Sequence, residues 1–349
     1  MMIHEQLKIK GLVVDPPLLL APMAGLTHSA LRTLLVSFGG VGLLSTEMLS
    51  ARRLPSENPA VSPYLVRTEA ETPLSYQLLV TDVREVGPAV EALHRFGADA
   101  IDLNLGCPAP KVRKAGGGSS LMNERDRVQA IVAAARRLTH LPLSAKIRLG
   151  ETLDPVGLDE FCRMLEGEGI DFLTVHARLR GESFTRKPRW DQIARVKERV
   201  GIPVIANGSV YSVDTARECL RISGADGLMI GRAAAERPWV FAEIAQDLYG
   251  SACRLPGKSR PEIYHQFVQA LTERFRPERR LGRLKEFTHY FARNYAFGHQ
   301  LASGVQASRD ISEAWSRALD FFRGNEPGFD LSALTGGDPD YFQRSGGLK

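Results

Sequence analysis

The chain alternates short apolar runs with longer segments in which apolar residues recur at every third or fourth position. Val83, Val86, Val90 and Leu93 illustrate the second pattern, which predicts helices with one buried face. The apolar runs are nearly continuous and rich in aliphatic and β-branched residues, which is typical of strands covered on both faces. Eight such runs lie at residues 18–23, 42–48, 74–80, 100–106, 143–149, 172–178, 203–208 and 227–232.

Eight strands alternating with helices predict an α/β fold, a (β/α)8 TIM barrel, because helical crossovers are the usual way to join parallel strands. An open, doubly wound sheet is the rival architecture. We favour the barrel because polar or special residues end nearly every run, and barrel active sites are built where the strands end. An open sheet would gather such residues at one switch point.

The pattern changes near residue 254, after which no strand is predicted and residues 261–275, 278–297 and 311–322 form helical patterns. We therefore predict a barrel over residues 1–250 and an all-helical domain over residues 251–349. Between residues 254 and 293, ten Lys and Arg stand against four Asp and Glu, a net charge of +6, while the whole chain carries only +5. The basic excess therefore belongs to the helical domain.

Composition narrows the class of protein. With 349 residues, 44% of them hydrophobic and 24% charged, the chain can bury a large core and is not expected to be disordered. The apolar run at 18–23 follows Asp15 and two prolines, so we expect neither a signal peptide nor a membrane span. The four cysteines form no CxxC pair, which argues against zinc sites and a disulfide framework and fits a cytoplasmic protein without metal.

Cys107 is the candidate proton donor. It follows the fourth run in the segment Asn104-Leu-Gly-Cys107-Pro108, and a glycine run at 116–118 comes shortly after it. A free thiol with a reference pKa of about 8.5 is mostly protonated at neutral pH and can give up a proton. The alternative is a small buried hydrophobe. We favour a thiol facing a cavity, because Pro108 stops the strand and polar loop follows.

Three polar side chains stand inside or at the end of other predicted strands. Gln77 is either a satisfied core amide or a partner for a ring carbonyl or imide of a ligand. Lys146 interrupts an apolar strand, and a buried ammonium is costly unless it meets negative charge, so we expect a functional role. His176 closes the sixth strand, where it either donates to a ligand or bonds to the backbone.

The ends of strands seven and eight predict a phosphate site. Asn207-Gly208-Ser209 and Gly231-Arg232 supply glycine amides and an arginine at the place where barrels commonly bind phosphate. Neither a GxGxxG motif after the first strand nor a GxxxxGK[ST] motif is present, which argues against a Rossmann dinucleotide site and a P-loop. A mononucleotide at the barrel mouth is the expected ligand.

The second predicted C-terminal helix has an apolar stripe that includes Leu284 and Phe287. Arg279, Arg280 and Arg283 gather at its start and along another face. The positive face is either a solvated surface or a site for a phosphate backbone.

Taken together, these motifs resemble those of the tRNA-dihydrouridine synthases. The resemblance spans residues 18–241 in family order. It rests on Ala21-Pro22-Met23-Ala24-Gly25, Thr46-Glu47-Met48, Asn104-Leu-Gly-Cys107-Pro108, Lys146-Ile-Arg148, Val175-His176-Ala-Arg178, Pro203-Val-Ile-Ala-Asn207-Gly208 and Leu228-Met-Ile-Gly231-Arg232.

This resemblance implies an FMN-binding barrel, a helical tRNA-binding domain, and NADPH-dependent reduction of uridine to 5,6-dihydrouridine in the D-loop of tRNA. A hydride would pass from reduced FMN to C6, and Cys107 would protonate C5. The implied FMN contacts are Pro22, Met23, Ala24, Gln77, Lys146, His176, Asn207, Gly208, Ser209, Gly231 and Arg232. The implied substrate contacts are Asn104 and Arg178, to which the basic face adds Arg279, Arg280 and Arg283.

The chain departs from the family pattern at two places, since Ser209 stands where the family often has an acidic residue and the loop after Cys107 carries a triple glycine. That glycine run and the segment 280–285 resemble the bacterial subgroup that acts on U16. We expect a monomer. The alternatives are a small-molecule FMN oxidoreductase of the dihydroorotate-dehydrogenase kind, which would not need the basic tail, and a non-enzymatic RNA-binding or chaperone module.

Overall fold

The computed structural model describes residues 6–253, 255, 257–327, 330 and 334. Its main sheet has eight strands, all parallel, in the order β3-β10-β9-β8-β7-β6-β5-β4. The strands are β3 Leu18–Leu20, β4 Leu44–Ser50, β5 Leu74–Leu79, β6 Ala100–Asn104, β7 Leu143–Arg148, β8 Phe172–His176, β9 Val204–Asn207 and β10 Gly227–Ile230.

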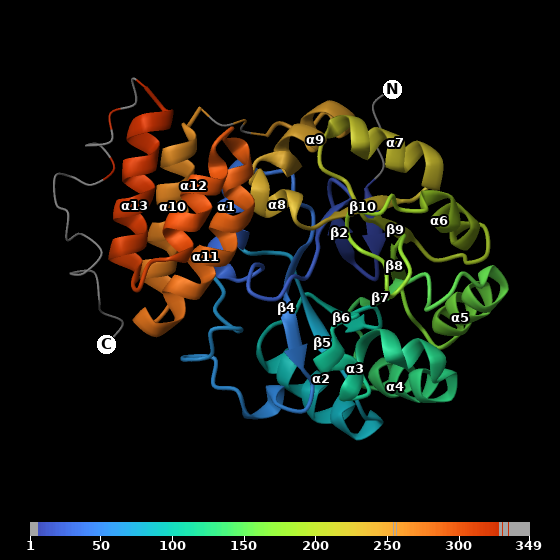
Figure 1. The fold of residues 1–349 in the computed structure, drawn as a ribbon. Coiled ribbons are helices and arrows are strands. Elements are labelled where there is room, and N and C mark those ends of the chain that lie inside the picture. Colours follow the sequence, from blue (N-terminus) through green and yellow to red (C-terminus); the bar gives the residue numbers. More distant parts are fainter. Residues whose placement is uncertain (1–5, 254, 256, 328–329, 331–333, 335–349) are drawn as a thin grey trace.

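The sheet closes on itself between its first and last strands. Leu19 and Leu43 form a parallel bridge, and the Leu20 amide donates to the Leu43 carbonyl at 2.9 Å. Figure 1 shows the resulting ring of strands with helices outside it and a bundle of helices at one side. The predicted (β/α)8 TIM barrel with a helical C-terminal region is therefore confirmed.

Most strands end earlier than the apolar pattern predicts. β3 stops at Leu20, and β6 stops at Asn104, whose side chain then accepts from the backbone of the following loop. Apolar residues continue past these points because they face a cavity or pack against loops. Hydrophobicity alone therefore marks the start of a strand better than its end.

An N-terminal hairpin of β1 (Leu7–Ile9) and β2 (Leu12–Val14) was not predicted, because three-residue strands are too short to show a periodicity. Its buried residues pack against Leu19, Phe172, Ile205 and Met229 of the barrel strands. The hairpin thereby adds to the apolar packing of the barrel.

Helices cover the outside of the barrel. They are α1 Ser29–Phe38, α2 Val86–Arg95, α3 Pro110–Lys114, α4 Arg125–Leu138, α5 Pro155–Gly167, α6 Trp190–Lys197, α7 Val213–Ser223, α8 Ala233–Glu236 and α9 Val240–Tyr249. Short 3₁₀ turns, η1 Leu54–Ser56, η2 Val83–Glu85 and η3 Gly118–Asn123, add to them. The connection from β4 to β5 contains η1 and then a loop over residues 57–73, in which Pro59 and Pro63 oppose a helix.

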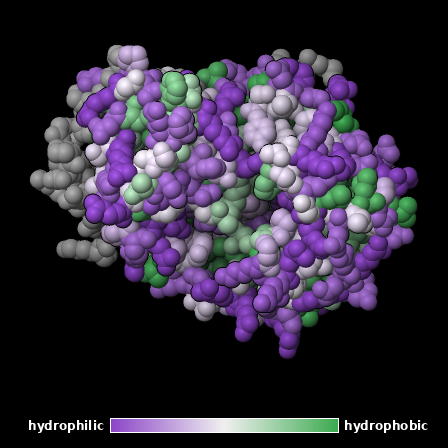
Figure 2. Space-filling view, viewed as in Figure 1, coloured by the Kyte–Doolittle hydropathy of each residue, from purple (hydrophilic) through white to green (hydrophobic). Residues whose placement is uncertain are grey.

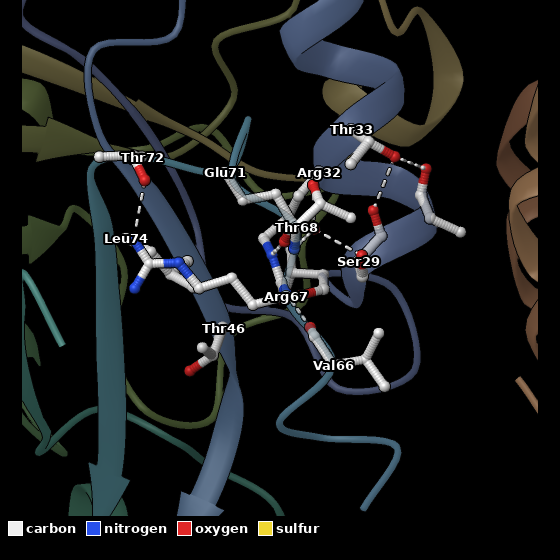
Figure 3. A network of polar contacts seen from close by, with 12 residues as sticks. Ser29, Arg32, Thr33, Thr46, Val66, Arg67, Thr68, Glu71, Thr72 and Leu74 are labelled. Carbon is white, nitrogen blue, oxygen red and sulfur yellow. Dashed lines mark hydrogen bonds and ion pairs between the residues drawn. The ribbon is translucent and has the colours of Figure 1, made fainter. Parts of the chain in front are cut away.

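That loop is fastened to α1 by a buried polar network, which Figure 3 shows from close by. The Arg32 guanidinium donates to Glu71 Oε2 at 2.5 Å and to the Val66 carbonyl at 2.7 Å. Glu71 Oε1 accepts from Ser29 Oγ at 2.5 Å and from the Thr68 amide at 2.9 Å. Arg32 and Glu71 are 1% and 0% exposed, so this ion pair is fully removed from water.

The helical region consists of α10 Arg260–Arg274, η4 Pro277–Arg279, α11 Arg280–Phe291, η5 Ala292–Asn294, α12 Gly298–Gln306 and α13 Ile311–Asn325. The single helix predicted over 278–297 is thus wrong in its bounds, and α12 was not predicted. The helical conformation is interrupted at Tyr295, whose extended backbone ends η5. Aromatic rings fill the core of this region, with Phe267 and Phe287 stacked at 3.8 Å between ring centres.

The helical region also packs on the barrel. α10 lies beside α1, and Arg274 of α10 donates to Thr33 Oγ1 and to the Ser29 carbonyl. The predicted boundary after residue 250 falls in the connection between α9 and α10. Within the described part of the chain, no helix is long and apolar enough to cross a membrane.

Candidate active site

A cavity of about 220 Å³ opens at the carboxyl ends of the barrel strands. A hollow is visible near the centre of the face in Figure 2, with pale and green residues at its edge and hydrophilic residues farther out. Fourteen of the predicted site residues line this one cavity. They are Pro22, Met23, Ala24, Gln77, Asn104, Cys107, Lys146, His176, Arg178, Asn207, Gly208, Ser209, Gly231 and Arg232.

The loop that carries Cys107 is held by a chain of buried hydrogen bonds. Asn104 Oδ1 accepts from the amides of Gly106 at 3.3 Å and Cys107 at 2.9 Å. Its Nδ2 donates to Gln77 Oε1 at 2.7 Å and to the sulfur of Met48 at 3.3 Å. Because both donors and both acceptor positions of the Asn104 amide are used within the protein, Asn104 positions the Cys107 loop and has no group left for a substrate.

The same series of hydrogen bonds continues from Gln77 to the buried carboxyl group of Asp102. Gln77 Nε2 donates to Asp102 Oδ2 at 2.7 Å, and Ser144 Oγ donates to Asp102 Oδ1 at 2.6 Å. Burial raises the pKa of Asp102, while the hydrogen bonds from Ser144 and Gln77 oppose that rise. Gln77 is thus partly satisfied by the core, as one of its two interpretations expects, and it still reaches the cavity wall.

Gly118 explains the glycine run that follows Cys107. Its φ is +60°, and a Cβ there would lie 2.7 Å from the Cys107 carbonyl oxygen. The next residue, Ser119, donates its amide to that same carbonyl at 3.0 Å. Only glycine allows this close approach, so the run supports the backbone of the candidate proton donor.

Lys146 reaches the cavity from β7 and donates to Asn207 Oδ1 at 2.9 Å. Asn207 in turn donates to the Met229 carbonyl at 2.7 Å, which fixes the orientation of its amide. Burial lowers the pKa of Lys146 to about 8, with a further lowering from the charge of Arg148. An anion in the cavity would have the opposite effect, because it would stabilise the charged ammonium.

Four cations surround His176. Burial, followed by the charges of Lys146, Arg148, Arg178 and Arg232, lowers the pKa of His176 well below its usual range. The imidazole is therefore neutral, which lets its Nε2 accept from Arg178 Nη1 at 3.2 Å. Among the described residues, the cavity lining contains neither Asp nor Glu. The cavity wall thus concentrates positive charge, and the nearby carboxyl group of Asp102 lies behind the lining.

Arg178 supports the loop after β8. It is 1% exposed and donates to the carbonyls of Arg186 at 2.7 Å and Phe184 at 3.0 Å, and to Ser209 Oγ at 2.7 Å. The predicted contact of Arg178 with RNA is not retained, because its guanidinium is buried and engaged in these bonds.

Several residues of the cavity lining, Phe184 and Arg148 among them, were not predicted as site residues from the sequence. Phe184 stacks on His176 with 5.9 Å between ring centres, and Arg232 lies 4.4 Å from the centre of the Phe184 ring. Arg148, at the end of β7, donates to the carbonyls of Gly106 and Leu179. The position of Arg148 after Lys146 could have indicated it, whereas Phe184 lies in an irregular loop without a pattern.

The three arginines predicted as one basic face differ in their surroundings. Arg279 is exposed. Arg280 is 5% exposed and donates to the carbonyls of Phe275 at 2.6 Å and Thr272 at 2.7 Å. Arg280 therefore caps the end of α10, and we correct its predicted contact with RNA to a structural role. Arg283 lies against the Phe275 ring, at 4.6 Å from its centre, and its side chain is 12% exposed.

A model of the family described as dihydrouridine synthase (Dus) matches residues 19–313. The chain belongs to the dihydrouridine synthase family. Both the predicted family and the predicted enzyme class are therefore confirmed.

The relatives of this dihydrouridine synthase cover most of its length. It is 35% identical to the tRNA-dihydrouridine(16) synthase of Aquipseudomonas alcaligenes, over 83% of this chain and 95% of that one. It is 33% identical to tRNA-dihydrouridine synthase B of Escherichia coli K12, over 85% of this chain and 92% of that one. A probable tRNA-dihydrouridine synthase of Rhodobacter capsulatus is 35% identical over 70% of this chain and 76% of the relative.

Solved structures support the fold. The structure of histamine dehydrogenase from Rhizobium sp. 4-9 matches this dihydrouridine synthase with a TM-score of 0.56 and 13% identity, over 77% of this chain and 51% of that one. At this identity the match supports the barrel and says nothing of the substrate.

Proposed function

We propose that this protein is an FMN-dependent synthase that reduces uridine to 5,6-dihydrouridine in tRNA, with NADPH as the electron donor. The observation that carries the proposal is Cys107, presented on a fixed loop at the wall of a cationic cavity in a chain of this family. The small-molecule alternative is not favoured by the family match or by the basic helical region.

The cavity fits a flavin mononucleotide on the chemistry of its walls. Four cations face it and no acidic residue among the described ones lines it, which suits a ligand that bears a phosphate. Gly208, with a φ of +121°, and Ser209 would hold the phosphate together with Gly231 and Arg232. The backbone of Pro22, Met23 and Ala24, with Gln77, Lys146, His176 and Asn207, would hold the ring system. When bound, the flavin supplies the hydride for C6 of the uracil.

The side chains of this protein then do the remaining chemistry. The Cys107 thiol would hold the proton that goes to C5 of the uracil. Lys146 would stabilise negative charge on the ring system without having to move, since its hydrogen bond to Asn207 fixes it. Asn104 and Gln77 would keep the thiol in place. The target base must leave its stack to enter the cavity, at a cost of a few kcal/mol.

The first experiment reduces the purified protein with NADPH in the absence of oxygen and then adds an unmodified tRNA transcript. Flavin reoxidation is followed by absorbance, and transcripts that already contain dihydrouridine serve as the control. We expect rapid reoxidation by the unmodified tRNA alone, with the product mapped in the D-loop and U16 as the first position examined. Reoxidation by neither RNA would contradict the proposal and favour a small-molecule flavoenzyme.

A further inference from the structure

A second cavity, of about 510 Å³, lies between the barrel and the helical region, directly beside the first. Ala24 and Met48 stand in the walls of both cavities. The volume falls within the range of about 300–1,000 Å³ that is common for small-ligand pockets. An RNA strand that places one nucleotide in the first cavity can therefore place a neighbouring nucleotide in the second.

The barrel contributes a buried carboxyl group to this second cavity. Glu47 is 5% exposed, and its Oε1 accepts from the Gly25 amide at 2.5 Å. Its Oε2 is buried and, within the described part of the chain, has no hydrogen-bond partner. The nearest cation, Arg283 Nη2, is 4.0 Å away, which is beyond hydrogen-bond distance. A buried oxygen without a partner is costly, and a ligand that brings an N–H donor would remove that cost.

Arg283 cannot simply move to satisfy Glu47, because its guanidinium is already held. Its Nη1 donates to the Arg279 carbonyl at 2.9 Å, and its plane lies against the Phe275 ring. Its own Nε is also buried and without a hydrogen-bond partner among the described residues. The residues that line the cavity therefore include a buried acceptor and a buried donor that both lack a partner among the described residues.

The remaining wall suits a base more than a phosphate. Its charged residues balance, with Arg53, Arg279 and Arg283 against Glu47, Glu57 and Glu278. Tyr64, which is 42% exposed, adds an aromatic surface from the loop that Arg32 and Glu71 fasten to α1. A neutral ring with polar edges can stack on such a side chain and hydrogen-bond to such a wall.

We propose that the second cavity binds the base of a nucleotide next to the target uridine and reads it through Glu47 Oε2. This inference rests on the proposed function, because it takes RNA as the substrate. The base expected there is guanine, because its N–H groups can donate to Glu47 Oε2 while its carbonyl oxygen accepts from Arg283 Nε. Glu47 is thus a specificity-determining residue for the sequence that flanks the reduced uridine.

The test uses the flavin-loaded protein and tRNA transcripts in which each nucleotide flanking the mapped uridine is changed to all four bases. We expect guanine at one flank to raise kcat/KM for dihydrouridine formation by about 10- to 100-fold, the effect of one hydrogen bond to a charged group. Glu47→Gln keeps the Oε1 acceptor for Gly25 but puts a donor in place of Oε2. It should reduce that preference to within about threefold, while Glu69→Gln, an exposed change on the loop that carries Tyr64, should leave it intact.

The outcomes separate this inference from the proposed function. Dihydrouridine formed with the same flanking preference in Glu47→Gln and the wild type, or with no preference in the wild type, would overturn only the inference. No dihydrouridine in any transcript would overturn the proposed function and the inference with it.

A second measurement covers the case in which Glu47→Gln does not fold. RNAs with the photoreactive guanine analogue 6-thioguanosine beside the target are irradiated in complex with the wild-type protein, and the crosslinked peptide is identified. We expect a crosslink at Tyr64 that Tyr64→Ala removes. Crosslinks at other residues alone would contradict a base in this cavity.

Discussion

The side chains of the reaction cavity divide into those whose hydrogen bonds are complete and those that keep a group for a ligand. Asn104 belongs to the first kind, because the Cys107 loop, Gln77 and Met48 use its whole amide. Cys107 and Lys146 belong to the second, and both face the cavity. A residue type alone therefore did not reveal which polar group is structural.

Cys107→Ala should keep its flavin and lose about 10²- to 10⁴-fold in the rate of dihydrouridine formation, the range for one general acid. Single-turnover reoxidation of the reduced protein by tRNA measures this rate. Cys253→Ala, at another partly buried thiol, is the matched control and should react like the wild type. Turnover of Cys107→Ala near the wild-type rate would contradict the assignment.

The charge of Lys146 should make FMN binding depend on pH. Its pKa is lowered to about 8, so the ammonium is present below that pH and is lost as the pH rises through it. The affinity of the flavin-free protein for the anionic cofactor should therefore fall between pH 7 and pH 9, as measured by quenching of flavin fluorescence. Lys146→Met should bind more weakly and show a flat profile, whereas Cys107→Ala should keep the decline.

At the scale of elements, the start of α11 shows how neighbouring residues on one helix acquire different roles. Arg279 and Arg280 are adjacent in sequence, yet the first is exposed and the second is buried against the last carbonyls of α10. The apolar stripe correctly predicted that Leu284 and Phe287 face the core. It did not predict that an arginine would share that buried side, because capping depends on where the preceding helix ends.

Arg279→Ala should consequently affect tRNA binding, whereas Arg280→Ala should affect the stability of the fold. Arg279→Ala should reduce the slope of log affinity for tRNA against log salt by about 1, as expected for one lost phosphate contact, and leave stability unchanged. Arg280→Ala should destabilise the fold by about 1–3 kcal/mol, because it leaves buried carbonyls unpaired. Filter binding across a salt series and denaturant unfolding measure the two effects, and an unchanged salt slope in Arg279→Ala would place the RNA elsewhere.

At the scale of the whole molecule, buried polar contacts on α1 join three parts of the chain. Arg32 fixes the loop after β4 through Glu71 and Val66, and Arg274 of α10 donates to Ser29 and Thr33 of the same helix. Burial and the charges of Arg283, Arg32 and Arg274 lower the pKa of His28, at the start of α1, well below its usual range. The relative position of barrel and helical region, and hence the second cavity, depends on this junction.

Glu71→Gln should therefore cost about 3–5 kcal/mol in the free energy of unfolding, since it leaves the Arg32 charge buried without its partner. Urea unfolding followed by circular dichroism measures the change. Glu69→Gln lies on the same loop in an exposed position and should stay within about 0.5 kcal/mol of the wild type. Equal stability of the two variants would show that the buried pair does not hold the loop.

The sequence by itself determined the barrel and most of the polar residues that line its cavity. Strand and helix patterns are local, and the carboxyl ends of parallel strands must meet at one face, so Cys107, Lys146, His176 and Arg232 were predictable as neighbours. Only the tertiary structure decided which polar groups were already satisfied, as for Asn104, Arg178 and Arg280. It also brought Glu47, Tyr64 and Arg283 together from three separate segments. Such contacts depend on how distant elements pack, and no periodicity along the chain records them.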